Sequence, residues 1–132
     1  MPQELELNEA WIEGDPGARW RSGAGHGPSM GARASGSSVL AVPPGCRLPR
    51  HTDSAEEVAV VVAGVADVLV GDERSTVPAG GVVLIPAEVP HEVRNAGEDV
   101  LYFVAVYADT QVVTHYEAEV QPTGSRERHP VG

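Results

Sequence analysis

From residue 37 onward, short valine-rich apolar runs alternate with Gly, Pro and Asp. Such runs of β-branched residues, bounded by turn residues, are typical of β-strands. No stretch of ten or more residues shows a convincing helical period, and the moderately helical window at residues 3–12 is short. Regular spacing of short strands predicts an all-β barrel or sandwich. The runs are "SSVLAV", "EVAVVVAG", "ADVLVG", "RSTV", "GVVLIP", "HEVRN", "VLYFVAVY" and "QVVTHYEAEV".

The turns and the two ends of the chain suggest how it is organised. Gly71-Asp72 in "VLVGDERSTV" predicts a two-residue hairpin turn. Residues 13–36 are rich in glycine, which favours a loop with room for one short strand at 18–22. We therefore expect an N-terminal arm or lid over 1–36, a barrel over 37–117 and a tail over 118–132. The polar tail is predicted to be irregular, either free or laid across a subunit surface.

Composition narrows the class of protein and of partner. A chain of 132 residues corresponds to one domain. Its net charge of -10 opposes binding to nucleic acid or to an anionic membrane surface. The single cysteine, Cys46, excludes an intramolecular disulfide and is expected to fill a small space in the core. With no long apolar segment and no basic-then-apolar start, we expect a soluble cytoplasmic protein.

Titratable residues lie directly before an apolar run in "HTDSAEEVAVVVAG", residues 51–64. Because side chains alternate faces along a strand, His51 and Asp53 point the same way, and Glu57 has the same parity. Glu56 has the opposite parity. A second cluster, "GGVVLIPAEVPHEVRN", supplies His91 after a proline-containing turn. These groups can converge only if the sheet curls, which would place them inside.

The first of these clusters resembles a motif of the small single-domain cupins. That motif is a glycine, five residues, His-x-His, three or four residues, Glu, six residues and a second glycine. Its counterparts here, with Asp53 in place of the second histidine, are Gly45, His51, Asp53, Glu57 and Gly64.

The second cluster resembles the other cupin motif, which is a glycine, five residues, Pro-x-Gly, two residues, His, three residues and Asn. Its counterparts, with Glu88 in place of the second glycine, are Gly80, Pro86, Glu88, His91 and Asn95. The resemblance covers about residues 37–107 and implies a double-stranded β-helix, which is a jelly-roll-like β-barrel.

The resemblance implies that His51, Asp53, Glu57 and His91 hold one divalent metal ion. If Asp53 binds directly, two carboxylates and two imidazoles suit Fe²⁺ or Mn²⁺, with Zn²⁺ or Ni²⁺ as alternatives. If the shorter aspartate reaches the ion only through water, the other three residues form a two-histidine, one-carboxylate triad. The competing interpretation is a metal-free cupin whose inward carboxylates are protonated, paired or hydrated.

Residues that share parity with the ligands predict the wall of an apolar pocket open to a small organic molecule. Ala59, Val61 and Val93 are the small members of this wall. In the strand after His91, either Phe103 and Tyr107 or Tyr102 would join them, unless these aromatics pack between sheets or subunits.

Three residues are candidates for moving a proton. Glu57 is the candidate within the ligand set. His26 lies in the glycine-rich arm and could reach the barrel mouth as an acid or base. Glu88 lies in a turn, where it is either an ordinary surface carboxylate or a group lining the mouth.

The function predicted from these residues is a metal-dependent cupin enzyme acting on a small, oxygen-bearing substrate. A dioxygenase is favoured because a triad with open positions suits O₂ and substrate together. The alternatives are a redox-neutral cyclase, isomerase or lyase, and a non-enzymatic protein that binds a metal or metabolite. A homodimer is expected, formed through outward apolar residues such as Val65 and Leu69.

Overall fold

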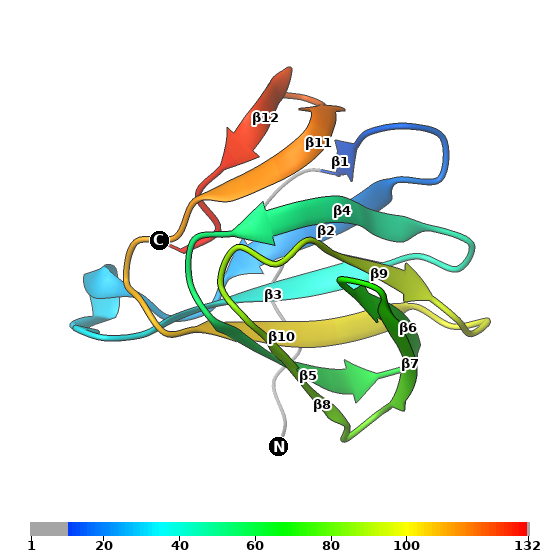
Figure 1. Ribbon diagram of the computed structural model, residues 1–132, viewed down its shortest axis with the longest axis horizontal. Coiled ribbons are helices and arrows are strands. Elements are labelled where there is room, and N and C mark those ends of the chain that lie inside the picture. Colours follow the sequence, from blue (N-terminus) through cyan, green and yellow to red (C-terminus); the bar gives the residue numbers. More distant parts are fainter. Residues whose placement is uncertain (1–10, 132) are drawn as a thin grey trace.

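Two antiparallel six-stranded sheets face each other in the computed structural model, which describes residues 11–131 (Figure 1). The expectation of an all-β protein is confirmed. The first sheet has the order β1 (Ile12–Glu13), β2 (Arg19–Ala24), β3 (Gly36–Val42), β10 (Leu101–Tyr107), β5 (Glu57–Ala63), β8 (Val82–Ile85). The second has the order β12 (Ser125–Arg128), β11 (Thr114–Val120), β4 (Arg47–Asp53), β9 (His91–Asn95), β6 (Val65–Val70), β7 (Glu73–Pro78). A short 3-10 helix, η1 (Pro28–Met30), lies between β2 and β3.

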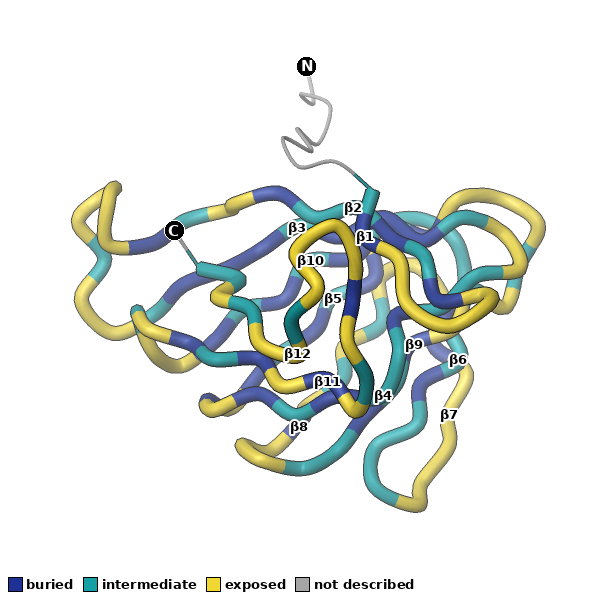
Figure 2. Tube along the Cα trace, turned by 90° about the horizontal axis from the view of Figure 1, so that it is seen from above, coloured by how far each residue is buried: buried dark blue, intermediate teal, exposed yellow. Residues whose placement is uncertain are grey.

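The strands alternate between the interior and the outer surface. In β10 every second residue from Leu101 to Tyr107 is buried. In β5, Ala59 and Val61 are buried, whereas Val62 is 49% exposed, so the long apolar run is two-faced rather than wholly internal. Figure 2 shows the same division, with buried positions along the strands and exposed ones mostly in the connecting loops. The period of two along each strand therefore decides which side chains can reach the interior.

The predicted hairpin between β6 and β7 is confirmed. Val70 pairs with Glu73, which leaves Gly71 and Asp72 as a two-residue turn. Gly71 has a φ of 57°, a conformation that glycine adopts without steric cost.

Both ends of the described chain contribute strands. The short strand expected at 18–22 is present as β2, which pairs with β3. The prediction that the tail is irregular is wrong, because β12 pairs with β11. The sequence "SRER" lacks apolar alternation because β12 is the edge strand of its sheet. The division into arm, barrel and tail stays a prediction, and residues 3–10 of the helical window lie outside the described residues.

The core fills the space between the sheets and supports the polar residues beside it. Trp20, Val42, Ile85 and Leu101 are among its fully buried side chains. Burying a large apolar side chain stabilises the fold by about 1.5–3 kcal/mol. The ring of Trp20 lies 5.5 Å from that of Tyr116, which lies 5.5 Å from that of His51. This row of rings connects the core to the titratable cluster.

Among residues 11–131, no helix has the length and apolar character needed to cross a bilayer.

Candidate metal centre

Two buried histidines face each other from neighbouring strands. His51 of β4 pairs with His91 of β9, and their ring centroids are 4.1 Å apart. The Nδ1 atom of His51 lies 2.6 Å from Pro49 O, and that of His91 lies 2.9 Å from Val89 O. Since a carbonyl oxygen only accepts, each Nδ1 is assigned the proton as donor. Each Nε2 is therefore the ring nitrogen turned toward the interior.

Asp53, the last residue of β4, adds a carboxylate to this pair. Its Oδ1 accepts a hydrogen bond of 2.6 Å from Thr114 Oγ1. Its Oδ2 lies 3.7 Å from His51 Nε2 and 3.2 Å from His91 Nε2. One donor atom from each of these three ligand candidates lies within 4.8 Å of the other two. This position favours the alternative in which Asp53 binds an ion directly.

Glu57 approaches the same centre from the opposite sheet. It is the first residue of β5, it is buried, and its Oε1 lies 3.5 Å from His91 Nε2. It is not a member of the group whose donor atoms all lie within 4.8 Å of one another. Direct ligation by Glu57 therefore stays a prediction, while its proximity to His91 is a feature of the structure.

The cluster has the donor atoms that a cation requires. Asp53 Oδ2 and His91 Nε2 are buried 3.2 Å apart, and among the described residues neither has a hydrogen-bond partner. An unsatisfied buried polar group costs about 1–3 kcal/mol. A divalent ion between these atoms would satisfy both, and imidazole nitrogen and carboxylate oxygen are ordinary ligands of such ions. The residues present therefore fit a metal ion.

His91 and Asp53 shift each other's pKa values. Burial opposes charge on His91, but Asp53 and Glu57 outweigh it and raise the pKa of His91 to about 10. Burial alone would raise the pKa of Asp53, yet His91 and His51 hold it at about 2. The two carboxylates thus stabilise the charged form of His91 more than burial destabilises it. In the metal-free protein, a proton on His91 occupies the atom that would bind the ion.

Burial dominates the other two groups. It raises the pKa of Glu57 to about 7. It also lowers the pKa of His51 to about 4, assisted by repulsion from His91. His51 is therefore neutral at pH 7, as a metal ligand must be.

A cavity of about 30 Å³ lies beside His51 and Asp53. This cavity has room for one or two waters, so by itself it is too small for a whole organic molecule. Its remaining lining residues come mainly from β2, β3, β11 and the tail: Trp20, Ser22, Ser38, Leu40, Leu48, Tyr107, Thr114, Tyr116, Arg128 and Pro130.

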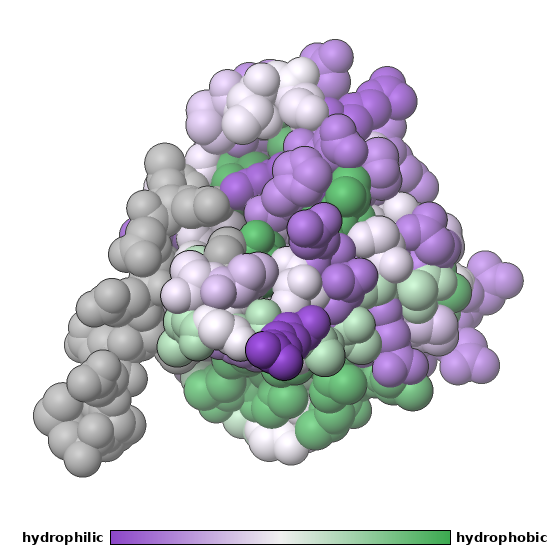
Figure 3. Space-filling view, turned by 90° about the vertical axis from the view of Figure 1, so that its left-hand side faces the viewer, coloured by the Kyte–Doolittle hydropathy of each residue, from purple (hydrophilic) through white to green (hydrophobic). Residues whose placement is uncertain are grey.

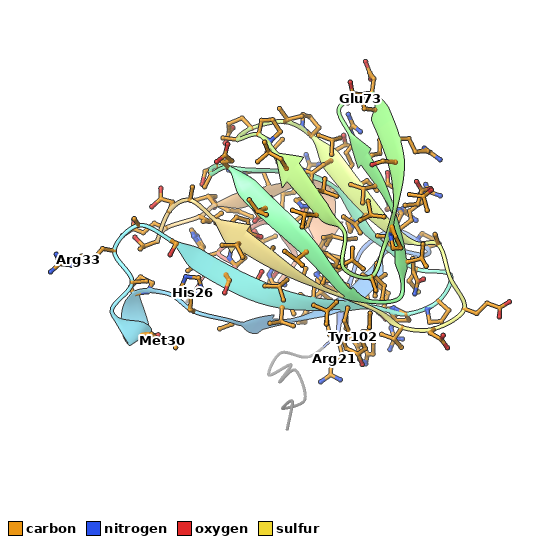
Figure 4. The ribbon with its side chains drawn as sticks, turned by 90° about the horizontal axis from the view of Figure 1, so that it is seen from below. Arg21, His26, Met30, Arg33, Glu73 and Tyr102 are labelled. Carbon is orange, nitrogen blue, oxygen red and sulfur yellow. The ribbon has the colours of Figure 1, made fainter. Side chains whose placement is uncertain are left out.

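The predicted wall residues separate into three groups. Tyr107 lines the cavity. The hydrophobic core contains Ala59, Val61, Val93 and Phe103, all buried. Tyr102 has the opposite parity and is only partly buried, and Figure 4 shows it at the outer side of the sheet near Arg21. The alternative that placed Tyr102 in the wall is therefore wrong.

His26 is not at the barrel mouth. Its Nδ1 lies 2.7 Å from Ser37 Oγ and its Nε2 lies 2.9 Å from Ser35 Oγ. Ser37 precedes Ser38, whose side chain lines the cavity, so Ser37 faces the other side of β3. Figure 4 shows His26 beside η1. Both ring nitrogens are occupied there, so the structure does not support His26 as an acid or base of the centre.

Of the two interpretations of Glu88, the structure favours the surface carboxylate. Its side chain is exposed, and its backbone N donates a hydrogen bond of 2.8 Å to Asp53 O. Its φ of 64° is in the left-handed region. Glu88 therefore acts on the centre through its backbone, which holds the end of β4, rather than through its carboxylate.

Sequence reasoning missed the residues that surround the donors. Thr114 and Tyr116 could have been found, because alternation in "VVTHYEAEV" gives them one face. Arg128 gave no such signal, since it lies in a polar tail without an apolar period.

Comparison with known proteins agrees with this geometry. The profile of one protein family, described as the cupin domain, matches residues 38–107, which is more than half of the chain. The chain belongs to the cupin family. No curated protein sequence matches the chain.

Several solved structures share the cupin fold. An oxalate decarboxylase mutant from Bacillus subtilis has a TM-score of 0.68 at 21% identity, over 86% of this chain and 30% of its own. A candidate sugar phosphate isomerase from Acidithiobacillus ferrooxidans has a TM-score of 0.59 at 24% identity, over 76% and 67% of the two chains. The cupin domain of Cnp3 from Schizosaccharomyces pombe has a TM-score of 0.62 at 14% identity, over 68% and 64%. At these identities the likeness establishes the fold alone.

The cupin motifs now have a structural explanation. Gly45, Gly64 and Gly80 all have a positive φ, which an L side chain rarely adopts. Glu88 occupies the position of the remaining motif glycine and keeps the left-handed backbone of that position. Asn95 donates to Val42 O and Asp99 O and accepts from Gly97 N, so it ties the end of β9 to β3 of the other sheet and to the loop that follows β9.

Proposed function

We propose that this cupin is a metal-dependent enzyme acting on a small oxygen-bearing organic substrate, with dioxygenation as the favoured reaction. The observation that carries the proposal is a pair of buried atoms, Asp53 Oδ2 and His91 Nε2, that have no hydrogen-bond partner within residues 11–131. They belong to a cluster of three donor atoms within 4.8 Å of one another. A purely structural cluster would be expected to satisfy its own polar atoms.

His51, Asp53 and His91 would hold the ion, with Glu57 as a fourth candidate ligand. Imidazole and carboxylate bind Fe²⁺, Mn²⁺, Zn²⁺ and Ni²⁺. Of these, Fe²⁺ or Mn²⁺ suits the favoured reaction, and Zn²⁺ or Ni²⁺ is the alternative. A set of two histidines and one carboxylate leaves positions open, and an ion bound there supplies Lewis acidity or oxygen chemistry. The protein's own part is to fix both rings through Pro49 O and Val89 O and to hold the carboxylate through Thr114.

A redox-neutral reaction, as in a cyclase, isomerase or lyase, is the second candidate. It is favoured by the position of Glu57, whose Oε1 lies 3.5 Å from His91 Nε2 without belonging to the three-residue donor group. A carboxylate at the edge of a metal site is suitably placed to move a proton of the substrate. A non-enzymatic metal-binding or metabolite-binding role is the third candidate, favoured by the small cavity.

Oxygen uptake separates these candidates. The protein loaded with Fe²⁺ or Mn²⁺ is mixed with a panel of diols and enols in an oxygen electrode. A dioxygenase consumes O₂ in proportion to substrate, and this uptake disappears in His91→Ala but persists in His115→Ala, an exposed histidine of β11. Product formation with Zn²⁺ without O₂ would instead favour the redox-neutral enzyme. Metal retained through purification without turnover would favour the binding protein.

We also propose a homodimer formed through the outer face of β5 and β8. Val62, Val82 and Leu84 are among the exposed large hydrophobic residues. Figure 3 shows hydrophobic side chains gathered low on the molecule, at the height of β5 and β8 in Figure 1. Val65 and Leu69, the residues expected to form the dimer contact, are half-buried and lie on β6 of the other sheet.

A second copy suits this face because two chains of charge -10 repel each other least where the outer faces that meet carry no charged residue. Light scattering should give twice the chain mass, and Leu84→Asp should give a monomer. A monomeric parent protein would contradict the dimer without affecting the proposed metal centre.

A further inference from the structure

Three buried side-chain atoms have no hydrogen-bond partner within residues 11–131. Two of them, Asp53 Oδ2 and His91 Nε2, belong to the candidate metal centre, and the third is Ser38 Oγ. Ser38 lies on β3 of the opposite sheet, is 1% exposed and lines the same cavity as Asp53. An ion between Asp53 and His91 would satisfy those two atoms. The hydroxyl of Ser38 still needs a partner of its own, because a buried hydroxyl without one costs free energy.

Tyr107 brings a second hydroxyl to this part of the interior. It lies on β10, between β3 and β5 (Figure 1), and lines the cavity. Burial raises the pKa of Tyr107 well above its usual value, and the carboxylates of Glu57 and Asp53 add to this effect. Ser38 opposes the rise in the pKa, so its hydroxyl lies close to the phenol. Tyr107 therefore keeps its proton and is a hydrogen-bond donor beside Ser38.

The size of the cavity decides what can lie between these hydroxyls. A water requires about 10–15 Å³ of such space, and the cavity of about 30 Å³ holds one or two. Buried waters usually bond two to four polar groups. Ser38 and Tyr107 supply two of these groups, and Asp53 Oδ2, or an ion bound to it, supplies a third. The space is thus polar enough and large enough for a single oxygen atom, but not for an organic molecule.

We propose that Ser38 and Tyr107 form a binding site for one oxygen ligand, water or hydroxide, beside the metal centre. Both side chains come from the sheet that faces His51, Asp53 and His91, so the ligand lies between the two sheets. With both hydroxyls as donors, the site favours hydroxide, or fluoride as its mimic, because hydrogen bonds to a charged acceptor are the stronger ones. The binding of water needs no metal. Only the binding of an anion rests on the proposed function, since the ion supplies the positive charge.

The stability of the metal-free protein tests the water site. Ser38→Ala removes a hydroxyl that bonds the water, so the ratio of folded to unfolded protein should fall by about 2- to 10-fold. Ser75→Ala, which changes an exposed serine of β7, is the control and should behave like the parent. Denaturant unfolding with a chelator present measures all three proteins. A Ser38→Ala variant as stable as the parent, or more stable, would overturn the water site, because removing a hydroxyl that has no partner costs nothing.

A high-resolution crystal structure of the metal-free protein tests the position of the water. We expect one ordered water within hydrogen-bond distance of both Ser38 Oγ and Tyr107 Oη. A direct hydrogen bond between these two hydroxyls, with nothing bound between them, would contradict the site.

Fluoride binding to the Mn²⁺-loaded protein, followed by fluorine NMR relaxation, tests the preference for an anion. Ser38→Ala and Tyr107→Phe should each weaken fluoride by about 10- to 100-fold, the usual effect of losing a hydrogen bond to a charged group. Tyr102→Phe, a change on the outer side of β10, should bind fluoride like the parent. Elemental analysis establishes that each variant keeps its metal. Unchanged fluoride affinity in Ser38→Ala and Tyr107→Phe would show that these hydroxyls do not bind the anion.

Metal binding and water binding can fail independently. A protein that takes up no metal, yet holds the water and loses stability in Ser38→Ala, would overturn the metal function and support the water site. An ion at the donor cluster beside a direct bond between Ser38 and Tyr107 would do the reverse.

Discussion

Asp53 Oδ2 and His91 Nε2 lie 3.2 Å apart in the interior, and neither has a hydrogen-bond partner among the described residues. Each residue is otherwise fixed, since Asp53 Oδ1 accepts from Thr114 and His91 Nδ1 contacts Val89 O. The two free atoms therefore result from how the strands hold these side chains. A cation held between them would give both atoms a partner.

Thr114→Val should lower metal affinity by about 10- to 100-fold, the usual effect of losing a group that orients a ligand. The change removes the hydroxyl that bonds Asp53 and alters little else in volume. Thr114→Ser should restore most of the affinity. Chelator competition measures both, with the exposed Thr76→Val as the control. Equal affinity in Thr114→Val and the parent would show that this bond does not orient a ligand.

Asp53→Asn should weaken metal binding at least about tenfold more than Glu57→Gln. Only Asp53 belongs to the group of donor atoms within 4.8 Å of one another, whereas Glu57 approaches His91 alone. Both changes remove one carboxylate charge at nearly constant shape, so the comparison isolates position. Metal titrations followed by elemental analysis provide the ranking. The reverse order would identify Glu57 as the principal carboxylate ligand.

Between pH 7 and 9 the metal-free protein should lose stability, because folding raises the pKa of His91 from 6.5 to about 10. A raised pKa contributes stability that is complete below the unfolded value and disappears as the pH rises through the folded value. Glu57, whose pKa is raised to about 7, has lost most of its contribution by pH 7 and loses the rest just above it, which acts in the same direction.

Added metal should reverse this trend, since metal and proton compete for His91 and metal affinity increases as the proton is released. Denaturant unfolding at several pH values, with chelator or with metal, measures both slopes. His91→Gln should flatten the metal-free slope. A metal-free protein that becomes more stable from pH 7 to 9 would contradict the assignment.

Glu88→Val should destabilise the protein by more than about 1 kcal/mol, whereas Glu88→Gly should leave stability unchanged or increase it. The reason is the φ of 64°, which glycine adopts freely and a β-branched residue adopts at a cost. Thermal and denaturant unfolding give the comparison. Equal stability of the two variants would mean that the turn changes its backbone to suit the residue.

The strands could be predicted from the sequence because the alternation of buried and exposed residues along a strand involves only residues that are close in the chain. Alternation in "VLYFVAVY" and the turn at Gly71-Asp72 depend on neighbouring residues, and both are present as expected. The resemblance to the two cupin motifs likewise located His51, Asp53 and His91, and strand alternation places the first two on one face of β4.

The residues around the donors depend on long-range pairing and could not be predicted in this way. Arg128 lines the cavity because β12 pairs with β11. The sequence of β12, "SRER", has no alternation of apolar residues from which a strand could be predicted. The glycine-rich sequence around His26 allows it to reach the barrel mouth, whereas in the structure Ser35 and Ser37 hold it on the other side of β3. The position of Glu57 relative to His51, Asp53 and His91 depends on how the two sheets pack, which the sequence pattern does not give.

The most direct test of the central claim is a crystal structure of the protein as isolated, with anomalous scattering recorded above and below the absorption edges of Mn, Fe, Ni and Zn. The account predicts one anomalous peak bonded to His51 Nε2, Asp53 Oδ2 and His91 Nε2. It would be contradicted by crystals grown with excess metal that show no peak there, with Asp53 and His91 hydrogen-bonded to each other or to water.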